Sequence, residues 1–412
     1  MNEKTGEGKL LSPNQRAWRR LFNNRPALFG MLLIVFAMIV AVLGYLIAPD
    51  STPNANQQIT EVQLKDPGFE VQVLKQRKNR PVEKVGIVQK MLFGQPDPFR
   101  RIPINAFEFI GDSILVEKYA GENQEIGTLN RGKTLTFHIA DIIYPLGAEQ
   151  NIRRQQDTLV FNELSGNTIR TTADALKQSI QDKYLYQKTY YLGTDIFGRS
   201  MLSRLILGVR ISLVVGLIAV IISLTIGILL GAISGYFGGR VDDLVMLLIN
   251  TVWSIPTLLL VFAIVLALGR GIGIIFLAVG LTMWVEVARI VRGQVMALKE
   301  VQFVEAAQGM GFTTIRIIVR HILPNILGPV MVIAAANFAT AILIEAGLSY
   351  LGFGIQPPMP SWGTMLNENY GYAISGRPLL ALVPAMAIML MVLAFNLLGN
   401  GFRDALDVKA NN

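Results

Sequence analysis

Residues 304–325 read VEAAQGMGFTTIRIIVRHILPN and lie between two long apolar stretches. Ala306 and Ala307 favour a helix while presenting almost no side chain, so another protein surface can approach the backbone closely there. Gly311 suits the position just after a helix end, where the backbone needs a positive φ. The segment therefore predicts a short helix that ends at a glycine, and not a plain loop.

A second short helix is expected directly after that glycine. Thr313 or Thr314 can cap its N-terminus, and Pro324 stands where the next apolar stretch begins. Its apolar face would consist of Ile315, Ile317, Ile318 and Ile322. A short helix held rigidly between two membrane helices can transmit force from a cytoplasmic partner, which a flexible loop cannot do.

Apolar stretches dominate the chain on both sides of this segment. A helix needs about 20 apolar residues to cross the hydrocarbon layer, because unsatisfied backbone polar groups are costly in lipid. The stretch that begins at Gly271 is short, so its helix is expected to run past Glu286 toward Ile290. The six predicted spans are Ala27–Ala48, Ile211–Phe237, Leu244–Gly269, Gly271–Val285, Ile322–Ile344 and Pro378–Phe402. These spans predict an all-α polytopic membrane protein with six transmembrane helices.

The charged residues are concentrated in one part of the chain. Of the 412 residues 52% are hydrophobic and 16% are charged, against about 25% charged in an average soluble protein. Yet 38 of the 66 charged residues lie between Pro49 and Arg204. We therefore expect residues 49–190 to form a mixed α/β domain inserted between the first and second spans, since about 140 residues can bury a core of their own.

Basic residues set the expected orientation. The tail of residues 1–26 holds six Lys and Arg against two Glu, so the positive-inside rule places it in the cytoplasm. Six spans then put the C-terminal tail, residues 408–412, in the cytoplasm too, and residues 49–190 outside. Five basic residues of the connection between spans four and five would also lie inside, which is consistent: Arg289, Arg292, Lys299, Arg316 and Arg320.

Several function classes are excluded by composition. Cysteine is absent, so disulfide scaffolds, thiol nucleophiles and Cys/His zinc sites are not expected. The two histidines, His138 and His321, lie outside the spans and no aspartate lies within one, so the groups that intramembrane proteolysis needs are missing. The net charge of +8 accompanies no nucleic-acid-binding motif. We predict that the chain is not an enzyme, binds no metal and binds no nucleic acid.

Residues 127–134, GTLNRGKT, formally match the P-loop pattern. A working P-loop follows a buried strand and opens a helix whose amides hold phosphate. Here polar residues precede the match and the residues after it alternate as in a strand, so a hairpin loop is expected.

Small and polar residues mark particular places in the spans. Gly227, Gly231 and Gly235 form a ridge that lets another helix backbone approach closely. Glu345, at the outer end of the fifth span, and Asn250, in the third, are polar groups at membrane depth. Each either bonds a neighbouring helix or lines a transport pathway, and both interpretations stay open.

The 304–325 segment resembles the EAA motif of permease subunits of binding-protein-dependent ABC importers. The residues at the family's spacing are Glu305, Ala306, Ala307, Gly311, Leu323 and Pro324. The run RHILPN from Arg320 is similar to the dipeptide and oligopeptide importer branch. So are residues 192–199, 235–242, 288–295 and 348–358.

The resemblance covers the first span and about Tyr191–Asp407, and it points to the C-type permease of a pair. The chain departs from the family at Ser200, where aspartate is usual, and at Asn250, where an acidic residue is common. Its external segment is also far longer than usual.

The resemblance implies a type I ABC importer permease fold, with residues 191–407 as the core and 299–325 as the coupling loop. It implies a bacterial inner-membrane heterodimer with a second permease subunit, two cytoplasmic ATPases and an extracytoplasmic peptide-binding protein. ATP and Mg would bind only in the ATPases, so no cofactor is expected in this chain, and the pathway would carry di- or oligopeptides. The external domain would dock the binding protein or roof the pathway.

Two other classes are weighed against this one. A secondary transporter would need no ATPase, and it should show inverted repeats with interrupted helices, which the sequence lacks. A membrane receptor or assembly scaffold would account for the external domain but not for the segment that resembles the EAA motif.

Overall fold

The computed structural model describes residues 13–83, 85–123, 128–129, 132–147, 152–269 and 271–406. The chain forms two compact units, and we describe each by itself. Unit 1 combines Met1–Ala41 with Gly208–Asn412, and unit 2 is Val42–Leu207. The second unit contains the predicted insertion, residues 49–190, and extends beyond it at both ends.

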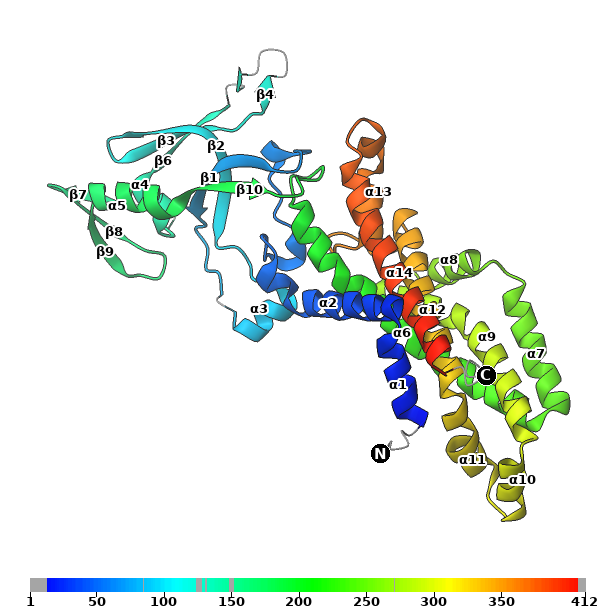
Figure 1. Cartoon of the computed structure of the whole chain (residues 1–412). Coiled ribbons are helices and arrows are strands. Elements are labelled where there is room, and N and C mark those ends of the chain that lie inside the picture. The colour runs from blue at the N-terminus through cyan, green and yellow to red at the C-terminus, as the bar shows by residue number, and fades with distance from the viewer. Residues whose placement is uncertain are drawn as a thin grey trace, which may run out of the picture. The chain divides into compact units, whose positions relative to one another are not determined.

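Unit 1 is helical (Figure 1). Among the described residues, five helical runs are long and apolar enough to cross a membrane. They are α2 (Arg25–Ile47), α6 (Met201–Phe237), α9 (Ile272–Lys299), the run Thr314–Tyr350 and α14 (Leu379–Leu406). The run Thr314–Tyr350 consists of α11 (Thr314–Ile317), η4 (Ile318–Ile322) and α12 (Leu323–Tyr350). The shorter helices are α1 (Pro13–Asn23), α7 (Gly239–Trp253), α8 (Thr257–Leu268), α10 (Gln302–Gly309) and α13 (Trp362–Ile374).

The predicted third span is not one straight helix, and this corrects the prediction for Leu244–Gly269. Helices α7 and α8 replace it and are bent by 89° at the break between them. Pro256 lies at that break. Proline lacks the N–H that a continuing helix needs, and it restricts the residue before it, so the helix stops and restarts.

The glycine ridge on α6 packs as predicted. A Cβ on Gly227 would lie 2.5 Å from the Val287 Cβ, and one on Gly231 would lie 2.5 Å from the Ala288 carbonyl oxygen. A Cβ on Gly235 would lie 2.6 Å from the Arg292 carbonyl oxygen. Helices α6 and α9 therefore touch backbone to backbone over three successive turns, which only glycine permits.

Unit 2 is built on a five-stranded antiparallel sheet in the order β10-β1-β2-β3-β6. These strands are β1 (Phe69–Arg77), β2 (Phe99–Ile110), β3 (Ser113–Lys118), β6 (Thr134–His138) and β10 (Leu185–Tyr190). A second sheet holds β7 (Arg153–Gln155), β8 (Thr158–Asn162) and β9 (Thr168–Thr172), and a small pair holds β4 (Glu122–Asn123) and β5 (Thr128–Leu129). The helices are α3 (Ile87–Phe93), α4 (Ile139–Ile143) and α5 (Ala173–Ser179), with the turns η1 (Pro53–Ala55), η2 (Thr60–Val62) and η3 (Ile180–Tyr184).

The main core of unit 2 lies between this sheet and the helices α4 and α5. Strand residues such as Leu74, Ile104 and Ile114 pack there with Ile139 and Leu176 of the helices. The P-loop match, residues 127–134, ends where strand β6 of this sheet begins. Its residues 127, 130 and 131 lie outside the described residues, but residues 134–138 form strand β6, whereas a P-loop would open a helix there.

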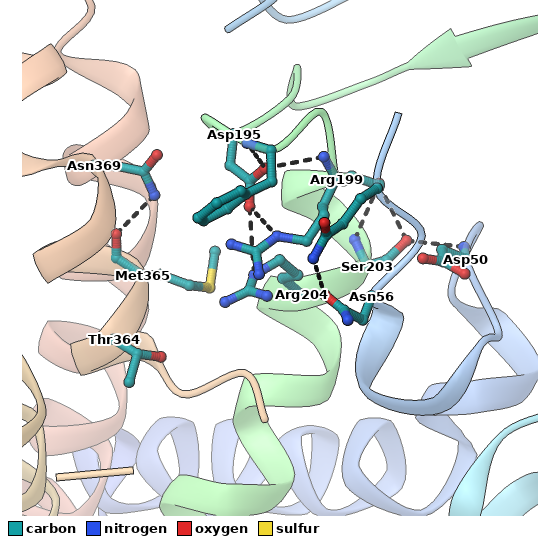
Figure 2. A network of polar contacts seen from close by, with 12 residues as sticks. Asp50, Asn56, Asp195, Arg199, Ser203, Arg204, Thr364, Met365 and Asn369 are labelled. Atoms are coloured by element: carbon teal, nitrogen blue, oxygen red, sulfur yellow. Dashed lines mark hydrogen bonds and ion pairs between the residues drawn. The ribbon is translucent and has the colours of Figure 1, made fainter. Parts of the chain in front are cut away.

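A buried ion pair fixes the turn that leads into α6 (Figure 2). Arg199 Nε donates to Asp195 Oδ2 at 2.6 Å, and the backbone amides of Phe197 and Arg199 donate to Asp195 Oδ1 at 2.9 Å. At the start of α6, Ser203 Oγ accepts from the Asp50 amide at 2.9 Å. Ser200, which departs from the family pattern, accepts a hydrogen bond from the Ser203 hydroxyl at 3.1 Å. These bonds satisfy the Asp195 carboxylate, which would otherwise be costly to bury.

Candidate functional site

Helix α10 is the short helix predicted from the quoted segment, and it ends as predicted. Gly311 has φ +75°. Its amide donates to the Gln308 carbonyl at 2.9 Å, and the Phe312 amide donates to the Ala307 carbonyl at 3.1 Å. This pair of bonds is the Schellman motif, which satisfies carbonyls at a helix end and needs the positive φ that glycine supplies. The turn after α10 is therefore defined by hydrogen bonds.

The two alanines of α10 have different environments. Glu305 and Ala306 are exposed, but Ala307 is only 1% exposed and packs inside unit 1. The expectation that both alanines present an open backbone to another protein is therefore wrong for Ala307. On a helix this short, one face must cover the chain's own core, and the spacing of Val304 and Ala307 puts both on that face.

The core under α10 joins several helices. Val304 and Ala307 pack in one buried cluster with Tyr236 of α6, Val295 of α9 and Ile322. Gln308 Nε2 also donates to the Tyr236 hydroxyl at 3.4 Å. Because side chains from four elements interlock here, α10 is expected to move together with the ends of α6 and α9.

The second short helix continues into the membrane helix without a stop. Thr313 occupies the N-cap as predicted, but its side chain makes no capping bond. Ile315 is exposed, so that part of the predicted apolar face is wrong. Pro324 lies in the first turn of α12, and η4 before it is a wider π-helical turn. Proline has no N–H to donate, so the regular hydrogen-bond pattern is interrupted here, and the Leu323 amide bonds to the Ile318 carbonyl across the wider turn. Leu323 is partly buried against the cluster under α10, while Pro324 is exposed.

A bidentate ion pair holds α7 against α9 near the same end of the bundle. Arg292 donates from Nε to Asp242 Oδ1 at 2.6 Å and from Nη2 to Oδ2 at 2.5 Å. The Ser234 hydroxyl of α6 also donates to Asp242. Charge-assisted bonds in this fork geometry are among the stronger polar contacts, so three helices are joined at one carboxylate.

Glu345 is fully buried on α12, where the Ser349 hydroxyl one turn later donates to its Oε1 at 2.7 Å. The same hydroxyl accepts from the Ile355 amide at 3.0 Å. This arrangement favours the packing interpretation, because Oε1 is bonded within α12, although Oε2 is buried without a hydrogen-bond partner among the described residues.

Asn250 is exposed on α7, and its Oδ1 lies 3.5 Å from Arg289 Nη2 of α9. The Arg289 guanidinium stacks on the Trp253 ring, with its carbon 3.7 Å from the ring centroid. A cavity of about 190 Å³ borders Trp253, Glu286 and Arg289, with Ile333 of α12 on its wall. Among the described residues, neither Glu286 nor Arg289 makes an ion pair within this chain.

Sequence reasoning missed two of these polar groups. Apolar length places Glu286 only near the end of a span, although an ionisable side chain on a membrane helix is a functional signal in itself. Asn337 was overlooked inside the fifth span. It is 1% exposed, and its Nδ2 lies 3.5 Å from both the Ser223 hydroxyl of α6 and the Met283 carbonyl of α9. A search for Asn within the apolar stretches would have found it.

Within the part of the chain that the structure describes, no group of three acidic or histidine side chains could hold a metal ion.

Comparison with known proteins gives a consistent set of relatives. Residues 227–412 match the family model described as binding-protein-dependent transport system inner membrane component, and residues 12–67 match the N-terminal TM domain of oligopeptide transport permease C. The oligopeptide transport system permease protein OppC of Bacillus subtilis is 40% identical over 222 residues, which are 54% of this chain and 72% of that protein. OppC of Escherichia coli K12 is 44% identical over 220 residues, 53% of this chain and 72% of that protein.

Two further similarities follow. The dipeptide transport system permease protein DppC of Bacillus subtilis is 40% identical over 235 residues, 57% of this chain and 73% of that protein. A chain of the MetNI methionine ABC transporter, solved in an inward facing conformation, gives a TM-score of 0.41 at 20% identity and covers 50% of this chain and 97% of that chain.

Proposed function

The chain belongs to the family of inner-membrane components of binding-protein-dependent transport systems, and we propose that it forms half of a pathway for di- and oligopeptides in an ATP-driven importer. The family consists of permease subunits and not of catalytic enzymes. The peptide assignment rests on relatives that are named as oligopeptide and dipeptide permeases.

The observation that carries the proposal is the construction of α10. Its exposed face presents Glu305 and Ala306, and its other face is packed into the core of unit 1. We assign the exposed face to a groove of a cytoplasmic ATPase subunit. An importer of this kind would contain a second permease subunit, two ATPases and an extracytoplasmic peptide-binding protein. ATP and Mg would bind in the ATPases, which leaves this chain without a cofactor.

Coupling then follows from the packing under α10. Closure of the ATPases on ATP would displace α10, and the interlocked ends of α6 and α9 would move with it, which would change the pathway from inward- to outward-facing. A nearly complete change of state requires about 5.5 kcal/mol of differential binding. A coupling helix fixed by a Schellman turn and a buried face can transmit that difference, whereas a loop would dissipate it.

The pathway is proposed to run along the face of α9 that carries Glu286 and Arg289. A peptide has an ammonium group at one end and a carboxylate at the other, and these two side chains present the opposite charges one helical turn apart. Asn250 and Trp253 hold Arg289 in place from α7. Glu345 is assigned to packing.

The proposed topology counts the bent pair of α7 and α8 as one span, which gives six crossings with both termini in the cytoplasm. The basic residues near the proposed inner ends of the spans support this orientation. Unit 2 would then lie outside, where it can help to dock the binding protein.

The test compares two exposed alanines on neighbouring helices. Ala306→Arg on α10 should abolish co-purification of the ATPases and peptide uptake, because the bulky side chain blocks the docking face. Ala297→Arg, on the exposed face of α9, is the matched control and should keep both. Equal thermal unfolding temperatures of the two variants would show that the fold is intact. If Ala306→Arg takes up peptide normally, α10 is not the docking helix.

A further inference from the structure

Helix α3 of unit 2 carries apolar side chains that the described residues leave exposed. None of its seven residues is buried. Ile87 is 78% exposed, Val88 66%, Leu92 45% and Phe93 68%. At 100° per residue, Ile87, Val88 and Leu92 lie on one face and Lys90 lies on the other. A soluble surface rarely exposes such a cluster unless a partner or a lipid layer covers it.

Helix α3 lies next to the end of a candidate membrane span, which points to lipid as the group that covers its apolar face. Just after α3, the Gln95 amide donates to the Ser51 carbonyl at 2.9 Å. Gly94 has φ +78°, and a Cβ there would lie 2.8 Å from both that carbonyl oxygen and the Tyr45 ring. Tyr45 belongs to the last turn of α2, a candidate membrane span that ends at Ile47. Within unit 2, helix α3 is therefore attached beside residues 42–47, the last residues of the candidate span α2 (Figure 1).

A large polar cavity opens next to the same attachment point. It measures about 540 Å³, and Thr52, Pro53, Pro96 and Asp97 line it, within a few residues of Ser51 and Gln95. Its charged lining residues are Glu61, Lys78, Arg80, Asp97, Arg100, Arg101 and Lys118. Five of these seven side chains are cationic, so the cavity carries an excess of positive charge.

Both carboxylates of the cavity are already neutralised. Glu61 is paired with Lys118, and Asp97 Oδ2 accepts from Arg101 Nε at 2.8 Å. Arg80 and Arg100 are exposed, and in the described part of the chain neither of them nor Lys78 forms an ion pair. Arg80 and Arg100 thus remain for an anion from outside the chain, together with Lys78, whose Nζ donates one of its hydrogen bonds to the Asp97 carbonyl at 2.8 Å.

Two further observations favour an anionic ligand at this cavity. The Thr52 hydroxyl oxygen is buried and has no hydrogen-bond partner among the described residues, and such atoms are rare without a ligand or water. Burial lowers the pKa of Lys78, and the neighbouring Arg80 and Arg101 lower it further, against the opposing effect of Asp97. A bound anion would relieve that repulsion.

We propose that this part of unit 2 is a binding site for an anionic phospholipid. Helix α3 inserts its apolar face into the leaflet on which α2 ends, and the basic cavity beside it binds the phosphate group of a lipid in that leaflet. Lys90 can extend from the polar face of α3 toward the same headgroup layer. The proposal is independent of what the transporter carries, so it stands or fails separately from the peptide pathway.

The insertion of α3 is tested by depth measurement on the full chain. The sequence has no cysteine, so single labels can be placed without background. Leu92→Cys carrying a fluorophore should be quenched by lipids with a nitroxide near the headgroup when the protein is in a phospholipid nanodisc. Ile110→Cys, exposed to a similar degree at the β2–β3 turn, is the matched control and should not be quenched. An unquenched label at Leu92 would overturn the proposal.

The headgroup site is tested by lipid selectivity. In nanodiscs of phosphatidylcholine with a minor share of spin-labelled phosphatidylglycerol, the native chain should retain the anionic lipid in preference to the zwitterionic one. Removing the two exposed cations with Arg80→Gln and Arg100→Gln should weaken this preference by about fivefold for each cation. Arg153→Gln and Arg170→Gln remove two exposed cations from the second sheet and should leave it unchanged.

Two outcomes would contradict the headgroup site. Equal loss in both pairs of variants would mean that general surface charge attracts the lipid. Binding of soluble glycerol phosphate in detergent with an affinity equal to that for phosphatidylglycerol would mean that the cavity takes a free phosphate and not a lipid.

Discussion

Replacing Gly231 by alanine tests the contact between α6 and α9 on which the proposed coupling depends. The added Cβ would lie 2.5 Å from the Ala288 carbonyl oxygen and 2.9 Å from the Val291 Cβ. Ordinary contacts of a Cβ begin at 3.4 Å, so the two helices must separate locally by about 1 Å. Neither contacted atom is the end of a flexible side chain, so rotamer changes cannot absorb the clash.

The cost follows from that separation. A gap of 0.5–1 Å forfeits about a quarter to a half of the dispersion energy of each contact pair, and overpacking of this kind costs about 1–3 kcal/mol. Alanine is the better helix former by about 1 kcal/mol, which offsets part of the loss. We expect a net destabilisation of about 0–2 kcal/mol, which lowers the unfolding temperature by up to about 8 °C for a unit of this size, and a difference of about 1–3 kcal/mol from an alanine substitution that meets no clash.

The assay is thermal unfolding of the purified chain in detergent, followed by tryptophan fluorescence, because Trp284 of α9 lies in a core cluster that includes residues of α6. Gly293→Ala on α9 is the matched control, since a Cβ there meets nothing within 4 Å. It should unfold at the native temperature or slightly above. If Gly231→Ala unfolds at or above the temperature of Gly293→Ala, the helices are not in backbone contact and the reasoning fails.

Three further predictions concern charged groups. Burial and the nearby Arg101 lower the pKa of Lys188 to about 8. The folded state therefore loses this proton at a lower pH than the unfolded state, so the stability of unit 2 should rise between about pH 8 and 10.5. Lys188→Met should remove that rise, and hydrogen exchange of β1 and β10 in the intact chain measures it. Asp242→Asn should lower the free energy of unfolding by about 1–3 kcal/mol in the same thermal assay, because Arg292 loses its carboxylate partner. An unchanged unfolding temperature would show that the Arg292–Asp242 ion pair does not hold α7 against α9. Glu286→Gln should reduce peptide uptake without lowering the unfolding temperature, whereas a parallel loss of both would make Glu286 structural.

The sequence is sufficient where a single rule decides the structure. Apolar length predicts the membrane helices, the spacing of Gly227, Gly231 and Gly235 predicts a close helix contact, and Gly311 predicts the end of α10. Each of these follows from local sterics or from the thickness of the lipid layer. The membership in the permease family also follows from the resemblance of the coupling segment, and the comparisons confirm it.

The sequence fails where two rules compete or where tertiary packing decides. Leu244–Gly269 is apolar enough for a straight span, yet Pro256 bends it by 89°. Ala306 and Ala307 are identical in type, and only the register of α10 on its core separates the exposed one from the buried one. The cavity of unit 2 joins residues from turns and strands that are far apart in sequence, so no local pattern could reveal it.

Helix α9 is the element through which these observations connect. One end of it packs under α10 through Val295, its middle touches the glycine ridge of α6, and Arg292 binds it to α7. Glu286 and Arg289 lie on the same helix and border a cavity. A displacement of α10 therefore cannot reach the cavity without moving α9, because close-packed interfaces shift as units and do not deform gradually. We infer that α9 links the proposed ATPase-docking face to the proposed transport pathway, and that substitutions which loosen its contact with α6 should reduce transport before they unfold the protein.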